Sequence, residues 1–289
     1  MSQLHIIPPQ GHLLLATGDP VHTVLTYFFL AISNIGGQDF YFLVIPYLIW
    51  GRDKRLGVET ALLLITSSYL NLYLKEWFKV PRPPKDQWAP GVDVESYSFP
   101  SGHAQSAATF WTYLSVRLRK NWVIVTGLVL TVLICYSRIF LGVHRWNDIF
   151  VGLGLGVVIA LAFLLLRGPA TRLLGKMDHV QRLSLAVAVP IILFLLTRSV
   201  DYAHLLGFLL GVLAGAELEA TNLGMPDPKD GPQRWKRLII GYPLCGAIMF
   251  GLGHFGPTNT GWQFIVYTLA GMGITFFSPA IFSRYEKWN

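Results

Sequence analysis

Long runs of apolar residues, separated by short polar stretches, dominate the chain. Most of these runs have the length of a helix that crosses the hydrocarbon core of a bilayer, about 20 residues. The pattern predicts membrane-spanning helices at nine places: 38–50, 57–78, 103–118, 121–142, 147–167, 183–199, 202–221, 238–255 and 261–282. The predicted fold class is therefore all-α, a polytopic transmembrane helical bundle of about nine spans.

The first predicted span has an irregular start, because Gly36-Gly37 and Asp39 interrupt its apolar pattern. Residues 21–35 are predicted either to form a separate helix along the membrane surface or to lengthen this span. We therefore divide the chain into three parts. They are an N-terminal segment (1–37), a membrane core that carries all the motifs described below (38–170), and C-terminal transmembrane helices of unknown role (171–289).

The composition supports a membrane protein, with 53% hydrophobic and only 13% charged residues, whereas soluble domains have about 25% charged residues. The net charge of +7 needs no nucleic-acid partner, because basic residues in cytoplasmic loops produce such an excess. Cys135 and Cys245 both lie inside apolar runs. They suggest neither a disulfide framework nor a zinc site.

Lysine and arginine are concentrated in four of the loops between predicted spans, and the nine-span layout puts all four loops on one side. That side is cytoplasmic by the positive-inside rule. The loop at 79–102 and the turn at 143–146 then face the extracytoplasmic side. Neither a retention signal nor a glycosylation sequon is present, which favours a bacterial plasma membrane over the endoplasmic reticulum.

Three short segments meet on the outward-facing side in this layout: KEWFKVPRP, PSGH and SRIFLGVHRWND. Lys75, Arg82 and Arg138 place three positive charges near one point, and buried charges near a membrane tend to mark functional sites. Arginine also has a planar fork that matches phosphate oxygens. Ser101 is a plausible N-cap, and Gly102 lets the backbone approach a ligand closely. These features together predict an anion-binding site at a helix N-terminus.

The segments also contain groups suited to covalent chemistry. His144 and Asp148 are four residues apart, so they share one helical face if a helix begins near them. A carboxylate on one imidazole nitrogen leaves the other nitrogen free as a nucleophile. His103 is then available to protonate a leaving oxygen. The combination predicts phosphoryl transfer through a phosphohistidine, with cations instead of a divalent metal stabilising the charge.

The three patterns Lys-x6-Arg-Pro, Pro-Ser-Gly-His and Ser-Arg-x5-His-x3-Asp resemble the signature motifs of the type 2 phosphatidic acid phosphatase (PAP2) superfamily, over roughly residues 38–167. The resemblance implies a catalytic core like that of these phosphatases and of the vanadium haloperoxidases. It also implies His144 as nucleophile, Asp148 as its partner and His103 as general acid. The phosphate-binding residues would be Lys75, Arg82, Ser101, Gly102 and Arg138.

The leading functional prediction is a membrane lipid phosphatase that acts on a phosphomonoester or diphosphate, without metal or cofactor and with surrounding membrane lipids as its other partners. The alternative is a membrane transporter or scramblase that uses the site for headgroup binding. A vanadate-dependent oxidase would use the same anion-binding site, but the predicted membrane spans argue against it. Residues 84–99 are either a lid over the site or a solvated linker. Neither the lipid nor the oligomeric state can be read from the motifs.

Overall fold

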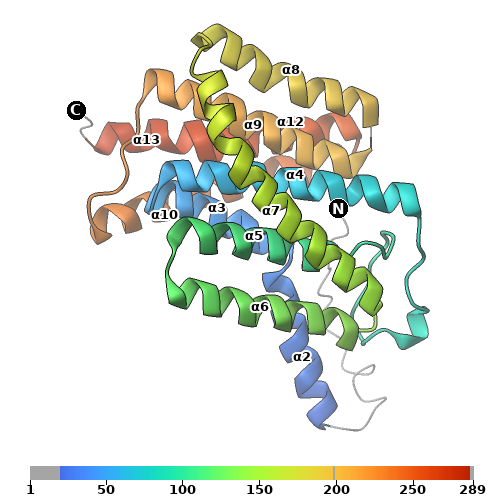
Figure 1. Ribbon diagram of the computed structural model, residues 1–289. Helices are drawn as coiled ribbons and strands as arrows, with labels where there is room; N and C mark the ends of the chain where they lie inside the picture. Colours follow the sequence, from blue (N-terminus) through green and yellow to red (C-terminus); the bar gives the residue numbers. More distant parts are fainter. Residues whose placement is uncertain (1–19, 198, 287–289) are drawn as a thin grey trace. The chain divides into compact units, whose positions relative to one another are not determined.

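A computed structural model describes residues 20–197 and 199–286 (Figure 1). All regular secondary structure in these residues is helical. The motif-bearing half contains α2 (Pro20–Ile35), α3 (Gln38–Gly51), α4 (Lys54–Phe78), η1 (Lys85–Gln87), α5 (Gly102–Leu118), α6 (Asn121–Phe140) and α7 (Trp146–Leu174). The remainder contains α8 (His179–Thr197), α9 (Val200–Asn222), α10 (Gly231–Ala247), η2 (Ile248–Leu252), α11 (Gly253–Phe255), α12 (Thr260–Met272), η3 (Gly273–Phe277) and α13 (Ser278–Tyr285).

Every predicted span overlaps one of these helices or a run of consecutive helices. Within residues 20–197 and 199–286, five stretches are long and apolar enough to cross a membrane, namely α6, α7, α8, α9 and Thr260–Tyr285. The consecutive helices α2 and α3 qualify as a sixth only as a pair bent by 47°. The chain is therefore an integral membrane protein, and the predicted count of nine spans is not confirmed. The helix α5 has only 17 residues, and α4 carries several polar residues in its second half.

The helix predicted for residues 21–35 is present as α2, in series with α3 across the break at Gly36-Gly37. The part of the predicted N-terminal segment at residues 1–19 lies outside the described part of the chain.

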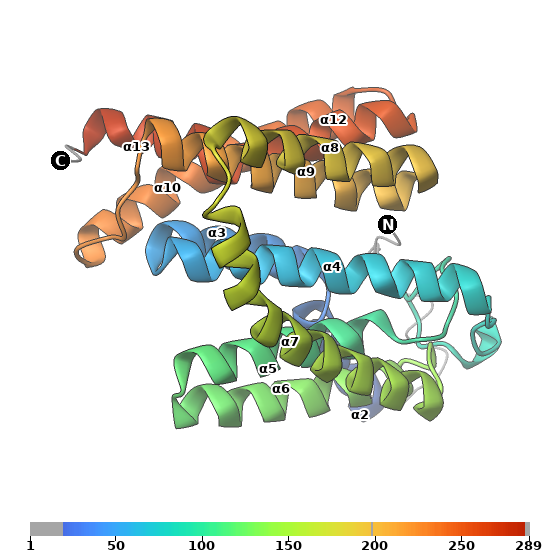
Figure 2. The same cartoon turned by 45° about the horizontal axis from the view of Figure 1, so that its top comes forward.

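The chain forms two compact units. One, which we call the motif unit, comprises the described residues up to Tyr41 together with Thr66–Leu165. The other, the extension unit, comprises Phe42–Ile65 and the described residues from Leu166 onward. In the motif unit, α5 and α6 form a hairpin of neighbouring helices, and α2 packs against α6 (Figures 1 and 2).

Two glycines of α7 bring this helix close to α5. A Cβ atom on Gly152 would lie 2.7 Å from the carbonyl oxygen of Ser101, and one on Gly156 would lie 2.4 Å from that of Gln105. Neither position leaves room for a side chain, so the backbones approach as closely as glycine allows. The Ser101 amide accordingly donates to the carbonyl oxygen of Asp148 at 3.0 Å. This crossing holds the start of α5 beside the first turn of α7.

The extension unit is built on a similar close contact between α9 and α12, and α8 also packs against α9 (Figure 2). A Cβ atom on Gly211 would lie 2.1 Å from the carbonyl oxygen of Thr268. The helices α10 and α12 begin with side-chain caps, in which Asp230 and Asn259 accept from backbone amides two residues into each helix. These caps satisfy amides that a helix start leaves unpaired.

Candidate active site

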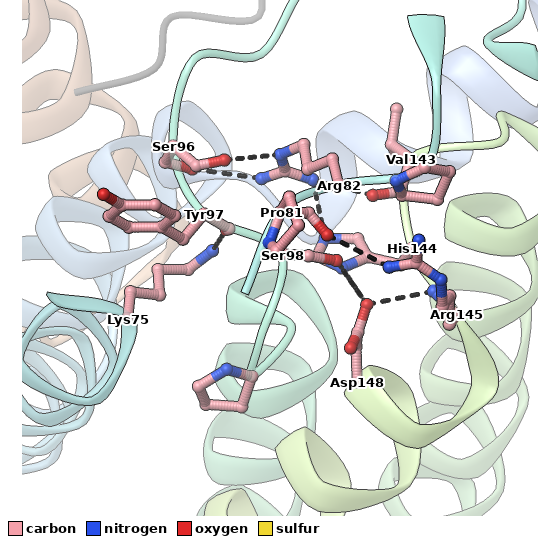
Figure 3. A network of polar contacts seen from close by, with 12 residues as sticks. Lys75, Pro81, Arg82, Ser96, Tyr97, Ser98, Val143, His144, Arg145 and Asp148 are labelled. Atoms are coloured by element: carbon pink, nitrogen blue, oxygen red, sulfur yellow. Dashed lines mark hydrogen bonds and ion pairs between the residues drawn. The ribbon is translucent and has the colours of Figure 1, made fainter. Parts of the chain in front are cut away.

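All eight residues predicted for the site lie in the motif unit, and they come from the helices α4 to α7 and the segments that connect them. Lys75 is near the end of α4 and Arg82 is in the loop after it. Ser101, Gly102 and His103 form the start of α5. Arg138 is in the last turn of α6, His144 is in the following turn, and Asp148 is in the first turn of α7. Figure 3 shows the side chains of Lys75, Arg82, His144 and Asp148 around one centre.

His144 and Asp148 form a buried pair, with His144 Nδ1 3.2 Å from Asp148 Oδ2 and side chains that are 1% and 4% exposed. A carboxylate only accepts hydrogen bonds, so the proton of the neutral imidazole is on Nδ1. The same oxygen accepts from the Arg145 amide at 2.9 Å and from the Ser98 hydroxyl. His144 Nε2 is therefore free to carry a lone pair, and it faces Arg82 Nη1 at 3.1 Å.

Burial lowers the pKa of His144 well below 6.5, against the opposing effect of its hydrogen bond to Asp148. The positive charges of Arg138, Arg82 and Lys75 lower this pKa further. The imidazole is therefore neutral at neutral pH, which is the state that a nucleophile requires. Burial also lowers the pKa of Arg82, to about 10, so this guanidinium remains charged beside the imidazole.

Arg82 is held by the loop that carries it and by the turn before α7. Its Nε and Nη2 donate to the carbonyl and hydroxyl oxygens of Ser96, at 2.6 and 3.0 Å. Its Nη1 donates to the carbonyl oxygen of Val143 at 2.9 Å. These contacts fix the plane of the guanidinium next to His144 Nε2. A group bonded to that nitrogen would lie within reach of Arg82.

Arg138 and Lys75 complete a cluster of cations. Arg138 is 1% exposed, its Nη1 donates to the hydroxyl of Ser33, and its buried Nε has no hydrogen-bond partner among the described residues. Lys75 is 6% exposed and donates to the carbonyl oxygen of Tyr97. Two positive charges, those of Arg82 and Arg138, act on Lys75 beside the negative charge of Asp148. A bound anion would offset this surplus and satisfy the unpaired Nε.

Ser101 occupies the N-cap position of α5, with extended backbone dihedrals, but its side chain makes no capping bond. Within the described part of the chain, the buried Ser101 Oγ has no hydrogen-bond partner. The predicted position is therefore correct, and the hydroxyl is available to a ligand instead of the helix. A Cβ atom on Gly102 would lie 3.0 Å from Asn71 Oδ1, so a side chain there would crowd the helix start.

His103 lies one residue into α5. It is close enough to interact electrostatically with His144 and with all three cations. The structure thus brings both predicted histidines, the predicted carboxylate and the three predicted cations into one cluster.

The sequence interpretation missed the serines that support this cluster. Ser98 donates to Asp148, and its oxygen is also 3.4 Å from His144 Nδ1. Ser96 and Ser33 hold Arg82 and Arg138. Ser98 and Ser96 lie within five residues of Ser101, so their nearness in sequence to the PSGH motif could have identified them as supporting residues. Ser33 is 105 residues from its partner and had no such signal.

A buried amide pair behind the start of α5 was also missed. Asn71 Nδ2 donates to the carbonyl oxygen of Pro100 at 3.2 Å and to Gln105 Oε1 at 2.9 Å. Gln105 Nε2 in turn donates to the carbonyl oxygen of Ser67 at 2.8 Å. This network ties α4 to the PSGH turn. Asn71 lies one helical turn before Lys75, so the two side chains share a face of α4, and this spacing was the available signal.

The loop at 84–99 is packed over part of its length, although residues such as Asp86 and Asp93 are exposed. Trp88, Ala89 and Val92 lie against a buried cluster formed by Leu30, Val94, Leu141 and Val143. The Ala89 amide donates to the carbonyl oxygen of Leu141 at 3.1 Å. The loop therefore packs against the turn before His144 and positions Ser96 and Ser98 in the site.

Among the described residues, no group of three or more histidine, cysteine, aspartate or glutamate side chains is arranged to hold a metal ion.

Comparison with known proteins gives two matches to family descriptions. Residues 56–172 match the PAP2 superfamily. Residues 203–287 match the transmembrane extension of PAP2 superfamily phosphatases. The first match contains all eight predicted site residues.

Individual relatives are lipid phosphatases by name. Phosphatidylglycerophosphatase B of Bacillus subtilis is 35% identical over 150 residues, which are 47% of this chain and 71% of that protein. Mouse sphingosine-1-phosphate phosphatase 2 is 30% identical over 190 residues, covering 61% of this chain and 51% of the relative. The chain thus spans about half the length of the sphingosine-1-phosphate phosphatases it matches. A crystal structure of a transmembrane PAP2 type phosphatidylglycerolphosphate phosphatase from Bacillus subtilis is 25% identical, covers 57% of this chain and 89% of that chain, and has a TM-score of 0.44.

Proposed function

The chain belongs to the PAP2 superfamily, and we propose that it is an integral-membrane lipid phosphatase. It hydrolyses a phosphomonoester or diphosphate of a lipid through a phosphohistidine intermediate, without metal. The observation that carries this proposal is the orientation of His144, whose Nδ1 is 3.2 Å from Asp148 while Nε2 faces Arg82. The names of the relatives support a lipid phosphate as the substrate class.

The reaction has two steps in this proposal. His144 Nε2 attacks the terminal phosphorus atom, the bond from phosphorus to the leaving oxygen breaks, and His103 gives its proton to that oxygen, which belongs to a lipid alcohol in a monoester and to a lipid phosphate in a diphosphate. Water then attacks the phosphohistidine and gives a proton back to His103. The bond from phosphorus to nitrogen breaks, which releases inorganic phosphate and restores the enzyme.

The remaining residues stabilise charge in both steps. Asp148 stabilises the imidazolium that forms when His144 becomes bonded to phosphorus. Arg82, Arg138 and Lys75 offset the negative charge on the phosphoryl oxygens. The Ser101 hydroxyl and the amides at the start of α5 donate to the same oxygens.

A phosphate-release assay tests the proposal directly. Purified protein in detergent micelles is given phosphatidate, phosphatidylglycerophosphate, a sphingoid phosphate and an isoprenoid diphosphate, with and without EDTA and vanadate. We expect release from at least one lipid, no effect of EDTA, inhibition by vanadate, and loss of activity in His144→Ala with an unchanged thermal midpoint. Full activity of His144→Ala, or loss of activity with EDTA, would contradict the mechanism. Headgroup binding without any phosphate release would favour the transporter or scramblase.

We further propose that the site faces the extracytoplasmic side of a bacterial plasma membrane. Support comes from the concentration of lysine and arginine in loops on the opposite side of the predicted layout. The exposed residue Asp86 in the 84–99 loop offers a test. An Asp86→Cys variant should react with a membrane-impermeant maleimide in intact cells. Labelling that required cell lysis would reverse the orientation.

A further inference from the structure

The helix α2 lies outside the motifs and outside the PAP2 match, which begins at residue 56, yet it contacts the site at several points. Its residues Phe29, Leu30 and Ser33 all face α6 and the turn that follows it. The ring of Phe29 packs on that of Phe140 at 4.6 Å. Leu30 lies in the buried cluster with Leu141 and Val143, and Val143 directly precedes His144 in the chain.

Ser33 makes the polar contact between α2 and the site. It is fully buried, and its hydroxyl accepts from Arg138 Nη1. Because Arg138 Nε has no partner in the described part of the chain, one edge of the guanidinium is anchored and another is available. An anchored guanidinium loses less conformational freedom when it binds a phosphate.

The chain leaves α2 beside His103. A Cβ atom on Gly36 would lie 2.6 Å from Ile134 Cγ2 and 3.3 Å from the Cδ2 atom of the His103 ring. Only glycine fits here without a shift of one of these side chains. The break between α2 and α3 therefore lies beside the His103 ring.

We propose that the C-terminal end of α2 is part of the active site. Ser33 is a positioning residue that orients Arg138 toward the phosphoryl group, and Gly36 gives the His103 ring the space it needs. The inference rests on the proposed function for the role of Arg138.

Three substitutions on α2 test the role of Ser33. Ser33→Ala removes the anchor, Ser33→Thr retains the hydroxyl, and Thr26→Val is the matched control. Thr26 is buried seven residues earlier in the same helix, and its hydroxyl donates to the carbonyl oxygen of His22, also in α2, at 2.9 Å. The readouts are kcat and KM for phosphate release, the inhibition constant of orthovanadate, and the thermal midpoint with and without orthovanadate.

We expect Ser33→Ala to reduce both kcat/KM and orthovanadate affinity about tenfold, the effect of losing one hydrogen bond to a charged group. Thr26→Val should remain within about twofold of wild type, and Ser33→Thr should recover most of the loss. Wild-type behaviour of Ser33→Ala, or an equal loss in Thr26→Val, would overturn the assignment.

Gly36→Ala provides a second test if Ser33→Ala does not fold. It should lower kcat at least about tenfold, as expected when a general acid is displaced, while orthovanadate affinity changes less. Full activity of this variant would overturn the part assigned to Gly36.

Orthovanadate binding also separates this inference from the proposed function. If wild-type protein releases phosphate and Ser33→Ala is unaffected, only the role of α2 is refuted. If wild-type protein neither binds orthovanadate nor releases phosphate, the proposed function is refuted.

Discussion

Arg138 of the motif unit and Arg237 of the extension unit are almost equally buried, with 1% and 0% of their surfaces exposed. Arg237 Nη2 lies 2.7 Å from Glu286 Oε2, and its Nη1 donates to the carbonyl oxygen of Pro226 at 2.9 Å. Among the described residues, the side-chain partner of Arg138 is a serine hydroxyl, and its Nε is unpaired. In this part of the chain, one buried arginine is neutralised by a carboxylate, and the other is not.

The same contrast holds more widely in the two units. The extension unit pairs Lys54 with Glu219 at 2.7 Å and Arg182 with Glu217 at 2.9 Å. In the described part of the motif unit, Lys75, Arg82 and Arg138 form no ion pair, and Asp148 bonds to His144. A buried charge is costly unless it is paired. The unpaired cations therefore indicate a ligand, whereas the paired ones indicate structure.

The largest expected effect comes from removing the charge of Asp148. Asp148→Asn should lower kcat by about 10³-fold or more, because an amide can stabilise the wrong tautomer of His144 and cannot stabilise the imidazolium. KM should change far less. Steady-state kinetics with the preferred lipid measures both. A loss of less than about tenfold would show that the carboxylate does not support the nucleophile.

Replacing the two buried arginines by methionine should separate function from stability. Arg138→Met should lower kcat/KM by about 10²–10³-fold, the usual range for losing a preorganised charge at the phosphoryl oxygens. Its thermal midpoint should stay the same or rise, because an uncompensated buried charge is removed.

Arg237→Met should have the opposite profile. It removes the cation that neutralises Glu286, a carboxylate that is 9% exposed and keeps a hydrogen bond from Gln233, and should cost about 3–5 kcal/mol of stability. Activity per folded molecule should be retained. Thermal unfolding in detergent and phosphate release per folded protein measure the two effects. Equal loss of stability in both variants would remove the distinction between paired and unpaired cations.

A smaller effect is expected for Ser98→Ala. Asp148 would lose one hydrogen bond but keep those from the Arg145 amide and His144. We expect kcat to fall about tenfold, the scale of one hydrogen bond to a charged group. Lys85→Ala, which removes an exposed ion pair with Asp93 in the same loop, should have no measurable effect. Equal activity of the two variants would show that Ser98 does not support the carboxylate.

The smallest expected effect is on the pH dependence of stability. Burial lowers the pKa of His144 in the folded protein, so the unfolded chain binds a proton first as the pH falls below about 6.5. Stability should therefore decrease with falling pH from about 6.5 down to the folded pKa, with a slope of up to about 1.4 kcal/mol per pH unit. His144→Gln should reduce this slope. Identical slopes of the thermal midpoint against pH would show that the folded pKa is not lowered.

The sequence predicted the helices well where the signal is local. Runs of apolar residues gave helices at every predicted span, since helical backbone satisfies its own hydrogen bonds in lipid. The span count was less predictable because α4 and α5 carry polar residues such as Asn71, Lys75 and Gln105, which serve the site and its supports.

The part of the site that could be predicted is the part carried by local sequence motifs. The eight predicted residues lie in short motifs with fixed spacing, so their proximity follows from hairpin connections between helices. Ser33 and Ser96 act through one or two hydrogen-bonding oxygens on a common residue type. Their partners depend on how α2 and the 84–99 loop pack, which no local pattern reports.

The proposed covalent intermediate provides the most direct test of the account. A preferred lipid carrying ³²P in its phosphate is mixed with purified wild-type protein, quenched with base within milliseconds, digested and analysed by mass spectrometry. The account predicts a base-stable, acid-labile phosphoryl group on His144, which appears and decays at rates compatible with turnover and is absent from His144→Ala. Phosphate release by wild-type protein without labelling of His144, or with the label on another residue, would contradict it.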